Sequence, residues 1–534
     1  MSNATELLRK GQVDLIWTKY CGFLDLNIKE FMEIQERLLL EQVELIHRSE
    51  IGRKLLPKIP TNMDEFRQIA PITSYEDYEM YFDEQREDIL PQEAHSWAHT
   101  SGRSGRLKWI PYTKEAYLRL GERVMAGVIL AAARYKGDIR LRERDVLVYN
   151  TPPRPYISGV ALRALSEHFN FQFVPPLEET ESMEFQERIV KSFDVGLKTG
   201  IDILGSMSAV LVKMGERFAE GARTTKLSTN ILHPKVIFRL LRGYFRSKIK
   251  GRAMLPKDLW RVRALPTGGM DTSIYKDIIS YYWGVAPHEQ YGSTEEGSLA
   301  TQAWNKKDMT FFPDAAFLEF IPDEEWSKWR LDSTYIPNTV LLDEIVPNKR
   351  YEVVITNFYG KPLCRYRMND IIIFTALEDK ETGVKLPQMS FVSRSDGFID
   401  LAGFTGLIDE KIVWQSIVNT GIPFEDWAMR KEFRDNKPFL HLYIEPKEAV
   451  DQDTILGKVN ECLKLLNPFY ADYEAMIDNN PLQITVLSPG SFNAYMKYQQ
   501  SLGADLAHLK PPHMNASDKA IDILLGNNGV QEIS

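Results

Sequence analysis

The side chains most suited to chemistry begin at residue 100, where the chain reads Thr-Ser-Gly-Arg-Ser-Gly-Arg-Leu-Lys. Glycines such as Gly102 let backbone N–H groups turn toward an anion, the hydroxyls of Ser101 and Ser104 add donors, and Lys108 adds a positive charge. The segment is not a Walker P-loop, because position 107, where that pattern needs glycine, is leucine. The composition predicts a phosphate-binding loop, although a glycine-rich surface turn would have the same composition.

Two later segments also combine glycine with polar side chains. Residues 265–269 read Leu-Pro-Thr-Gly-Gly and follow an expected strand at 260–264. Its last three residues, Thr267, Gly268 and Gly269, would permit close approach of the backbone to a flat ligand, or would form a tight turn.

Residues 289–297 read Glu-Gln-Tyr-Gly-Ser-Thr-Glu-Glu-Gly. In this segment Tyr291 could stack on a purine beside Gly292, and the hydroxyls of Ser293 and Thr294 could bond a phosphate. Glu295 could hold Mg²⁺, which prefers carboxylate and phosphate oxygens. A carboxylate at a helix N-terminus would explain Glu295 equally well.

Three candidates come from the last third of the chain. Asp370, expected at the start of a strand over 371–374, could accept hydrogen bonds from two ribose hydroxyls. Arg394 lies in the polar segment Ser-Arg-Ser-Asp-Gly at 393–397, which could be a hinge. Lys510 precedes two prolines, which hold a non-helical backbone suited to reaching into a site. Each residue has an ordinary alternative as a turn or surface side chain.

The pattern of apolar residues predicts an α/β protein. Buried strands are expected at 145–149, 202–204 and 317–320, and amphipathic helices at 27–48, 113–135, 160–169 and 206–219. Strands crowd together between 316 and 393, and a smaller α+β pattern follows, with strands near 439–445 and 482–487 and a helix near 453–466. We therefore expect a large domain over 1–395, with mostly parallel sheets and a β-rich subdomain. A small, mobile α+β domain would cover 396–534.

Length and composition limit the classes of protein. A chain of 534 residues is too long for one compact core, and its net charge of −9 gives no overall attraction to nucleic acid or an anionic membrane. The three cysteines are far apart and lack metal-ligand spacing, which fits a reducing compartment. Residues 1–10 lack a secretory apolar core and no apolar run approaches the ~20 residues needed to span a bilayer, so we expect a soluble cytoplasmic protein without nucleic-acid or membrane partners. We also expect a monomer or weak dimer. A basic run over 239–252 is more typical of a solvated helix face than of a partner- or phosphate-binding surface.

The order of these motifs resembles that of the acyl-adenylate-forming superfamily, which includes acyl-CoA synthetases, adenylation domains and luciferases. Within it, the chain is most similar to the Gretchen Hagen family of acyl acid amido synthetases. The phosphate loop continues into Lys-Trp-Ile-Pro at 108–111, a strand at 351–356 precedes Arg-Tyr-Arg-Met-Asn-Asp at 365–370, and the tail carries Lys-Pro-Pro-His at 510–513. The chain departs from the family pattern at Arg103, Asn369, Ser393 and His513, and plant members tend to have arginine at the last of these.

The resemblance implies ATP and Mg²⁺ as cofactors, a small carboxylic acid as substrate, and an amine or amino acid as acceptor. It implies that the loop residues Ser101, Gly102, Ser104 and Lys108 hold the triphosphate and that Lys510 stabilises the adenylation transition state. The 267–269 and 291–294 segments would flank AMP, Asp370 and Arg394 would contact the nucleotide, and Glu295 would bind the metal. Two alternatives stay open: a ligase that uses CoA as acceptor, and a non-catalytic nucleotide-binding protein.

Overall fold

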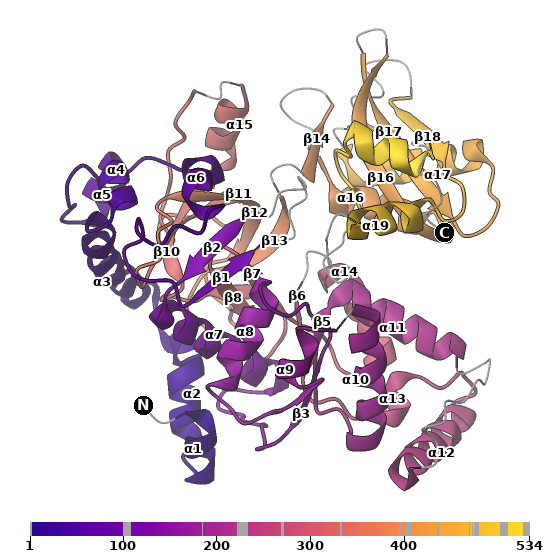
Figure 1. Ribbon diagram of the computed structural model, residues 1–534. Coiled ribbons are helices and arrows are strands. Elements are labelled where there is room, and N and C mark those ends of the chain that lie inside the picture. Colours follow the sequence, from indigo (N-terminus) through magenta and orange to yellow (C-terminus); the bar gives the residue numbers. More distant parts are fainter. Residues whose placement is uncertain are drawn as a thin grey trace. The chain divides into compact units, whose positions relative to one another are not determined.

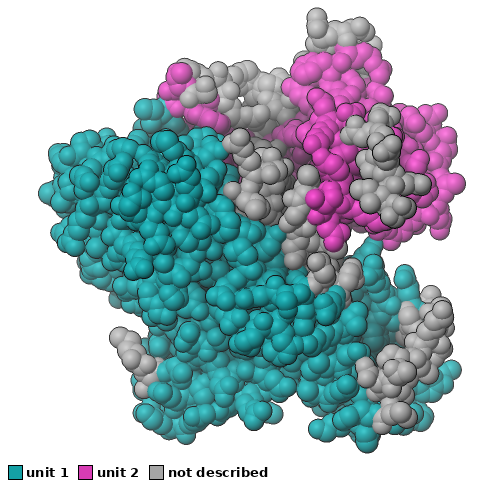
Figure 2. Space-filling model, in the orientation of Figure 1, with its two compact units in different colours: residues 1–323, 336–368, 373–391 teal, residues 324–335, 369–372, 392–534 magenta. Residues whose placement is uncertain are grey.

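The structure is a computed structural model in which residues 3–99, 108–183, 185–221, 233–268, 272–331, 334–394, 397–401, 407–434, 437–468, 470–471, 474, 480–501 and 511–526 are described. The chain forms two compact units (Figure 2). Unit 1 comprises residues 1–323, 336–368 and 373–391, and unit 2 comprises 324–335, 369–372 and 392–534. The expected boundary after residue 395 stays a prediction.

An eleven-stranded sheet runs through the large part of the molecule (Figure 1). Its order is β10 (Ala316–Pro322), β11 (Arg350–Asn357), β12 (Tyr366–Ala376), β13 (Gln388–Arg394), β9 (Met309–Phe311), β8 (Gly297–Gln302), β7 (His288–Ser293), β6 (Pro266–Gly268), β5 (Ile203–Met207), β3 (Val146–Tyr149) and β4 (Gln172–Val174). Strands β4, β3, β5, β6 and β7 pair in parallel, whereas β7 with β8, β8 with β9, β9 with β13 and β10 with β11 are antiparallel. The predicted parallel and β-rich regions therefore share one mixed sheet.

Helices connect the parallel strands, as the alternating pattern predicts. They include α8 (Ile157–Ser166), α10 (Phe185–Thr199), α11 (Ser208–Gly221) and α14 (Thr272–Trp283), and α7 (Lys114–Ala132) precedes the first of these strands, β3. Helix α7 begins at Lys114 because the Thr113 side chain caps it and accepts the Ala116 N–H. Strand and helix side chains such as Val148, Leu211 and Trp283 share one buried core. This core holds the strand ends that precede the candidate site.

The remaining helices of the first 331 residues lie before β1 (Ser96–His99), within the longer connections between parallel strands, or after β10. They are α1 (Ala4–Arg9), α2 (Val13–Cys21), α3 (Ile28–His47), α4 (Glu50–Leu55), α5 (Met63–Ile69), α6 (Glu79–Phe82), α9 (Leu177–Thr180), α12 (Pro234–Ile249), α13 (Pro256–Leu259) and α15 (Asp323–Leu331), with 3-10 helices at Gly22–Asp25 and Tyr75–Asp77. The predicted amphipathic helix at 27–48 is α3, which starts at a reciprocal capping box between Asn27 and Glu30. A two-stranded sheet pairs β1 with β2 (Trp109–Tyr112). In the described part of the chain, no helix combines the length and the apolar character needed to span a membrane.

The C-terminal part of unit 2 has its own sheet and core. Strands β16 (Phe424–Arg434) and β17 (Lys437–Pro446) are antiparallel, and β18 (Leu482–Val486) joins β17 in parallel. Helices α16 (Glu410–Asn419), α17 (Gln452–Leu466), α19 (Ser491–Ser501) and α20 (Asp518–Leu524) accompany this sheet, and β14 (Phe398–Asp400) pairs with β15 (Leu407–Asp409). Apolar side chains from the sheet and from α16 and α17, including Trp427, Ile444 and Val459, form a core of their own. The predicted separate α+β domain is confirmed.

Two local predictions are wrong. The strand expected at 260–264 does not form: Trp260 ends α13, its N–H bonding the carbonyl of Pro256, and β6 begins at Pro266. Apolar side chains there are buried in the helix–sheet core, and burial alone produced the strand-like pattern. Asp370 is also not at a strand start, because β12 begins four residues earlier at Tyr366.

Candidate active site

The segment 289–297 forms a tight β-hairpin. Residues 291–293 end β7, Gly297 starts β8, and the two strands pair in antiparallel register. A Cβ at Gly292 would lie 2.3 Å from the carbonyl oxygen of Gly297, so only glycine fits there, and Gly297 itself has a φ of +80°. Glu295 therefore lies in a hairpin turn, and the alternative of a helix N-terminus is wrong for this residue.

The carbonyl oxygens of this turn are held by donors from elsewhere in unit 1. The Tyr112 hydroxyl, at the end of β2, donates to the carbonyl of Thr294 at 2.8 Å. The Asn357 amide and the Lys361 ammonium both donate to the carbonyl of Glu295, at 3.2 and 2.7 Å. Three donors thus fix two consecutive peptide groups, and they set the direction of the side chains at 294 and 295.

A buried ion network lies directly behind the turn. The Glu296 carboxylate accepts from Arg123 at 2.9 Å, from Lys361 at 2.9 Å and from the amide of Asn357 at 2.6 Å. Both cations and the carboxylate are at most 3% exposed. Burial lowers the pKa of Lys361, and the adjacent Glu296 carboxylate opposes that effect. No local sequence pattern predicts this network, because positions 123, 296 and 361 are far apart in the chain.

Glu295 differs from its buried neighbour. Its side chain is half-buried, and one carboxylate oxygen accepts a long hydrogen bond from the Tyr366 hydroxyl at 3.4 Å. Among the described residues, no cluster of three His, Cys, Asp or Glu side chains could hold a metal ion without other ligands. Mg²⁺ is commonly bound by one or two carboxylates together with substrate phosphates. A single half-buried carboxylate on a fixed turn fits that kind of site.

Tyr291 lies in the core of the sheet. Its ring is 6% exposed, and its centroid is 6.3 Å from that of Phe311 and 6.0 Å from that of Phe391. The hydroxyl of Ser293 accepts the N–H of Glu296 at 3.3 Å and so helps to shape the turn. Stacking of Tyr291 on a purine stays a prediction.

The predicted phosphate-loop residues Ser101, Gly102 and Ser104 lie outside the described residues. The strands on either side are described: β1 and β2 are antiparallel, with His99 opposite Trp109. Lys108 is half-buried, and its ammonium lies 4.9 Å from the centroid of the Tyr75 ring. The same β2 strand carries Tyr112, so the residues that follow the loop are attached to the 291–296 turn.

The glycine pair follows a short strand beside β7. Thr267 is buried, lies opposite Glu289 in the parallel β6–β7 pair, and donates to the carbonyl of His288 at 3.2 Å. Gly268 ends β6, and Gly269 lies outside the described residues. Ligands of open α/β sheets bind at the carboxyl ends of parallel strands, where β6 and β7 bring these residues together.

Asp370 and Arg394 belong to unit 2, on the neighbouring strands β12 and β13. Asp370 is buried, and Asn369 before it has a φ of +57°, a conformation that asparagine tolerates. Arg394, half-buried, ends β13. In the motif before Asp370, Arg367 forms a buried bidentate ion pair with Glu352 at 2.8 and 2.6 Å, which gives this arginine a structural role.

Lys510 lies outside the described residues, but the chain after it is firmly attached within unit 2. The His513 ring lies between two carboxylates, with Nδ1 2.6 Å from Glu410 and Nε2 2.7 Å from Asp426. It stacks on the Trp427 ring at 4.4 Å with an interplanar angle of 5°. The two carboxylates raise the pKa of His513 to about 10 against the opposing effect of burial.

A surface cavity of about 480 Å³ opens elsewhere in unit 1, beside α3 and α7. Its lining includes Arg119 and Arg123 but none of the described residues that the sequence predicts for the site. Arg154, which lies outside that cavity, forms a surface ion pair with Glu181 at 2.7 Å. Neither feature supplies a pocket at the candidate site.

Comparison with known proteins decides the family. Three family models match in chain order: the GH3 family N-terminal domain over residues 22–172, the central domain over 309–394 and the C-terminal domain over 412–519. The chain belongs to the GH3 family. The resemblance to the Gretchen Hagen proteins is thereby confirmed.

Similar GH3 proteins are plant ligases. The 4-substituted benzoates-glutamate ligase GH3.12 of Arabidopsis thaliana is 25% identical over 303 residues, which cover 50% of this chain and 48% of that protein. The jasmonoyl–L-amino acid synthetase GH3.5 of Oryza sativa subsp. japonica is 25% identical over 294 residues, covering 51% and 48%. The chain thus spans about half the length of these curated GH3 relatives.

Solved structures show the same fold. The GH3 acyl acid amido synthetase AtGH3.15, in complex with 2,4-DB, has a TM-score of 0.68 at 18% identity and covers 95% of both chains. A 2-hydroxyisobutyryl-CoA ligase in its postadenylation state, in complex with 2-HIB-AMP, has a TM-score of 0.58 at 13% identity and covers 89% of this chain and 93% of that one. The predicted α/β fold of adenylate-forming enzymes is confirmed.

Proposed function

We propose that this GH3 protein activates a carboxylic acid with ATP as an acyl-adenylate and transfers the acyl group to an amine, such as that of an amino acid. The observation that supports this most is the fixed hairpin turn at 293–296, where hydroxyls and a half-buried carboxylate adjoin the carboxyl ends of β6 and β7. Such an arrangement suits phosphate and Mg²⁺ better than an apolar ligand. Similarity to GH3 proteins named as a benzoates-glutamate ligase and a jasmonoyl–L-amino acid synthetase supports the same reaction.

The proposed roles follow from the position of each segment. The loop residues Ser101, Gly102, Ser104 and Lys108 would hold the triphosphate, and Glu295 would hold Mg²⁺, which offsets negative charge on the phosphates. Residues 267–269 and 291–294 would flank AMP, Asp370 would bind the ribose, and Arg394 would contact the nucleotide. Lys510 belongs to the proposed mobile domain, residues 396–534. It would contact the carboxylate oxygens of the acid and the α-phosphate oxygens of ATP.

Both proposed steps are balanced displacements. An oxygen of the carboxylate attacks the α-phosphorus of ATP in line, an O–P bond forms, and pyrophosphate leaves with the electron pair of the broken bond. The amine nitrogen then attacks the acyl carbon, a C–N bond forms, AMP leaves, and the amine releases a proton to solvent. Such chemistry needs positioned charge more than covalent catalysis. The donors to the Thr294 and Glu295 carbonyls provide that positioning on the protein side.

The test is ATP–pyrophosphate exchange with a panel of aromatic, aliphatic and amino acids, run without acceptor. We expect exchange with at least one acid, and amide product once the matching amine is added. Lys510→Ala should slow exchange by about 10²–10³-fold with ATP binding unchanged, whereas the exposed Lys497→Ala should match the wild type. A chain that does not bind ATP would refute the proposal, and full exchange by Lys510→Ala would refute that assignment alone.

A thioester-forming ligase is the second candidate, because the fold is shared with a CoA ligase. Exchange without acceptor is common to both reactions, so the acceptor has to be tested separately. Incubation of the activated acid with CoA or with amino acids, followed by mass spectrometry of the product, distinguishes a thioester from an amide.

A further inference from the structure

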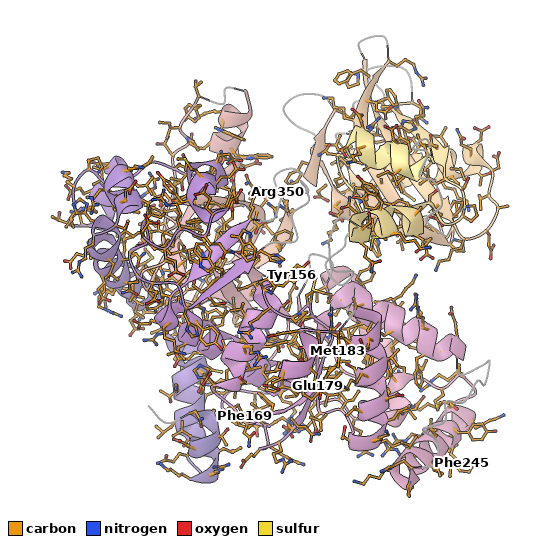
Figure 3. All side chains as sticks on the ribbon, in the orientation of Figure 1. Tyr156, Phe169, Glu179, Met183, Phe245 and Arg350 are labelled. Carbon is orange, nitrogen blue, oxygen red and sulfur yellow. The ribbon has the colours of Figure 1, made fainter. Side chains whose placement is uncertain are left out.

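Helix α12 (Pro234–Ile249) presents an apolar stripe to solvent. Its six apolar positions 237, 238, 241, 244, 245 and 249 follow the helical period and therefore share one side of the helix. Their side chains are between 40% and 86% exposed, and two are phenylalanines. Figure 3 labels one of them, Phe245, on α12. Single exposed apolar residues are ordinary, but a continuous stripe of this kind marks a binding surface.

The opposite side of α12 is fixed to unit 1. Val236, Gly243 and Ser247 are buried there, and a Cβ at Gly243 would lie 2.6 Å from a methyl carbon of Leu259 in α13. Arg242 donates to the carbonyl of Leu259 at 2.6 Å. Figure 1 shows α12 beside α13 at the edge of unit 1. The apolar stripe is therefore held outward by the packing of the inner face.

The helix and the turn after it are strongly cationic. Between residues 233 and 252 the chain has seven basic side chains and no acidic one, although the whole chain has a net charge of −9. The basic residues are Lys235, Arg239, Arg242, Arg246, Lys248, Lys250 and Arg252. Burial lowers the pKa of Arg242, and the nearby guanidinium groups of Arg246, Arg261 and Arg239 lower it further. Lys235, Lys248 and Lys250 are exposed, so this surface attracts anions.

We propose that α12 binds this protein to anionic membrane surfaces, with the exposed Lys235, Lys248 and Lys250 on lipid phosphates and its apolar stripe at the acyl boundary. An exposed apolar stripe, Lys and Arg on the polar side and few acidic residues are the features of helices that lie in a membrane interface. A second copy of the chain is a poorer occupant, because two α12 helices would bring five positive charges against five. This revises the expectation of a protein without membrane contact. It does not depend on the proposed reaction, since α12 carries none of the predicted site residues.

The test is co-sedimentation of the full chain with vesicles of phosphatidylcholine and phosphatidylglycerol in equal amounts, compared with phosphatidylcholine alone. We expect binding to the anionic vesicles that weakens as salt is raised. The double variant Phe238→Ser with Phe245→Ser should weaken partitioning by at least about tenfold. Replacing Lys235, Lys248 and Lys250 by Gln should weaken it by about fivefold for each lysine removed.

Matched controls use side chains of the same kind elsewhere. Leu465→Ser removes an apolar residue that is 83% exposed in unit 2, and Lys29→Gln removes an exposed lysine on α3; both should bind as the wild type does. Circular dichroism and light scattering check that the variants fold. Absence of binding to anionic vesicles at low salt would overturn the proposal. The proposal would also be overturned if the double phenylalanine variant bound anionic vesicles as strongly as the wild type. The same holds if the wild type forms a dimer without lipid and the double variant does not.

Discussion

The charged clamp formed by Glu410 and Asp426 around His513 allows a quantitative prediction about the stability of unit 2. His513→Gln keeps a hydrogen-bonding side chain but removes the imidazolium that lies between Glu410 and Asp426. In the folded chain the pKa of His513 is about 10, above an ordinary value of 6.5. A raised pKa stabilises the fold fully below about pH 6.5, and this contribution is lost as the pH rises through about 10.

The magnitude follows from the size of the shift. At about 1.4 kcal/mol per pKa unit, the imidazolium contributes at most about 4 kcal/mol at pH 7 and about 1.4 kcal/mol at pH 9. The three side chains keep between 15% and 25% of their surface in contact with solvent. Because solvent screens the charges, we expect the variant to lose about 2–3 kcal/mol at pH 7 and less than half of that at pH 9.

Hydrogen exchange of β16 and β17, followed by mass spectrometry, measures this locally. The strands pair next to His513, whose carbonyl accepts the N–H of Met429 at 2.6 Å. Opening free energies for the variant and the wild type are compared at each pH after division by the intrinsic exchange rate. His513→Arg keeps a permanent cation, so its own opening free energy should not fall between pH 7 and pH 9 through loss of this charge. His441→Gln is a second control, because burial lowers the pKa of His441 and keeps it neutral over this range.

If His513→Gln lowers the opening free energy equally at pH 7 and pH 9, the charge on His513 does not stabilise unit 2. That result would assign the effect to packing on Trp427 rather than to charge. An additional effect on adenylation is expected if Lys510, three residues earlier, acts as proposed, because this clamp holds the chain that follows it.

Two further predictions concern the hairpin turn. Lys361→Met leaves Glu296 with one buried cation fewer, so the free energy of unfolding of unit 1 should fall by about 3–5 kcal/mol, and an unchanged thermal transition would contradict the role of this ion pair. Gly292→Ala places a Cβ 2.3 Å from the carbonyl oxygen of Gly297, so limited proteolysis should detect an opened hairpin and the unfolding free energy should fall by about 1–3 kcal/mol. Gly205→Ala is the matched control, because its Cβ would meet nothing within 4 Å, and equal losses in the two glycine variants would refute the steric argument.

Local signals predicted much of the fold. The period of apolar residues placed α3, α7 and α17, and alternating apolar runs placed β3, β10 and β11, because these elements bury one face or both faces against a core. The same signal misplaced a strand at 260–264, where Trp260 is buried at the end of α13 and Ala264 forms an isolated bridge to Ile203 in β5. It also did not reveal β16, an eleven-residue strand that carries several charged side chains.

The order of motifs along the chain was enough to predict the family. Each motif is a short contiguous string that can be recognised although the overall identity to the relatives is low. The hairpin at 289–297 was not predicted, although its tight turn requires Gly292 and both Gly292 and Gly297 stand in that segment.

Only the tertiary structure decided which side chains support the candidate site. Tyr112 and Thr294 are 182 residues apart, and Arg123 and Glu296 are 173 apart, so no local pattern connects them. From the sequence, a Mg²⁺ ligand and a carboxylate at a helix N-terminus explain Glu295 equally well. The fold buries Glu296 in an ion network and leaves Glu295 half-buried on the turn. The physical reason is that the sequence sets the chemical type of each side chain, while burial and charge partners arise only when segments far apart in the chain pack together and exclude water.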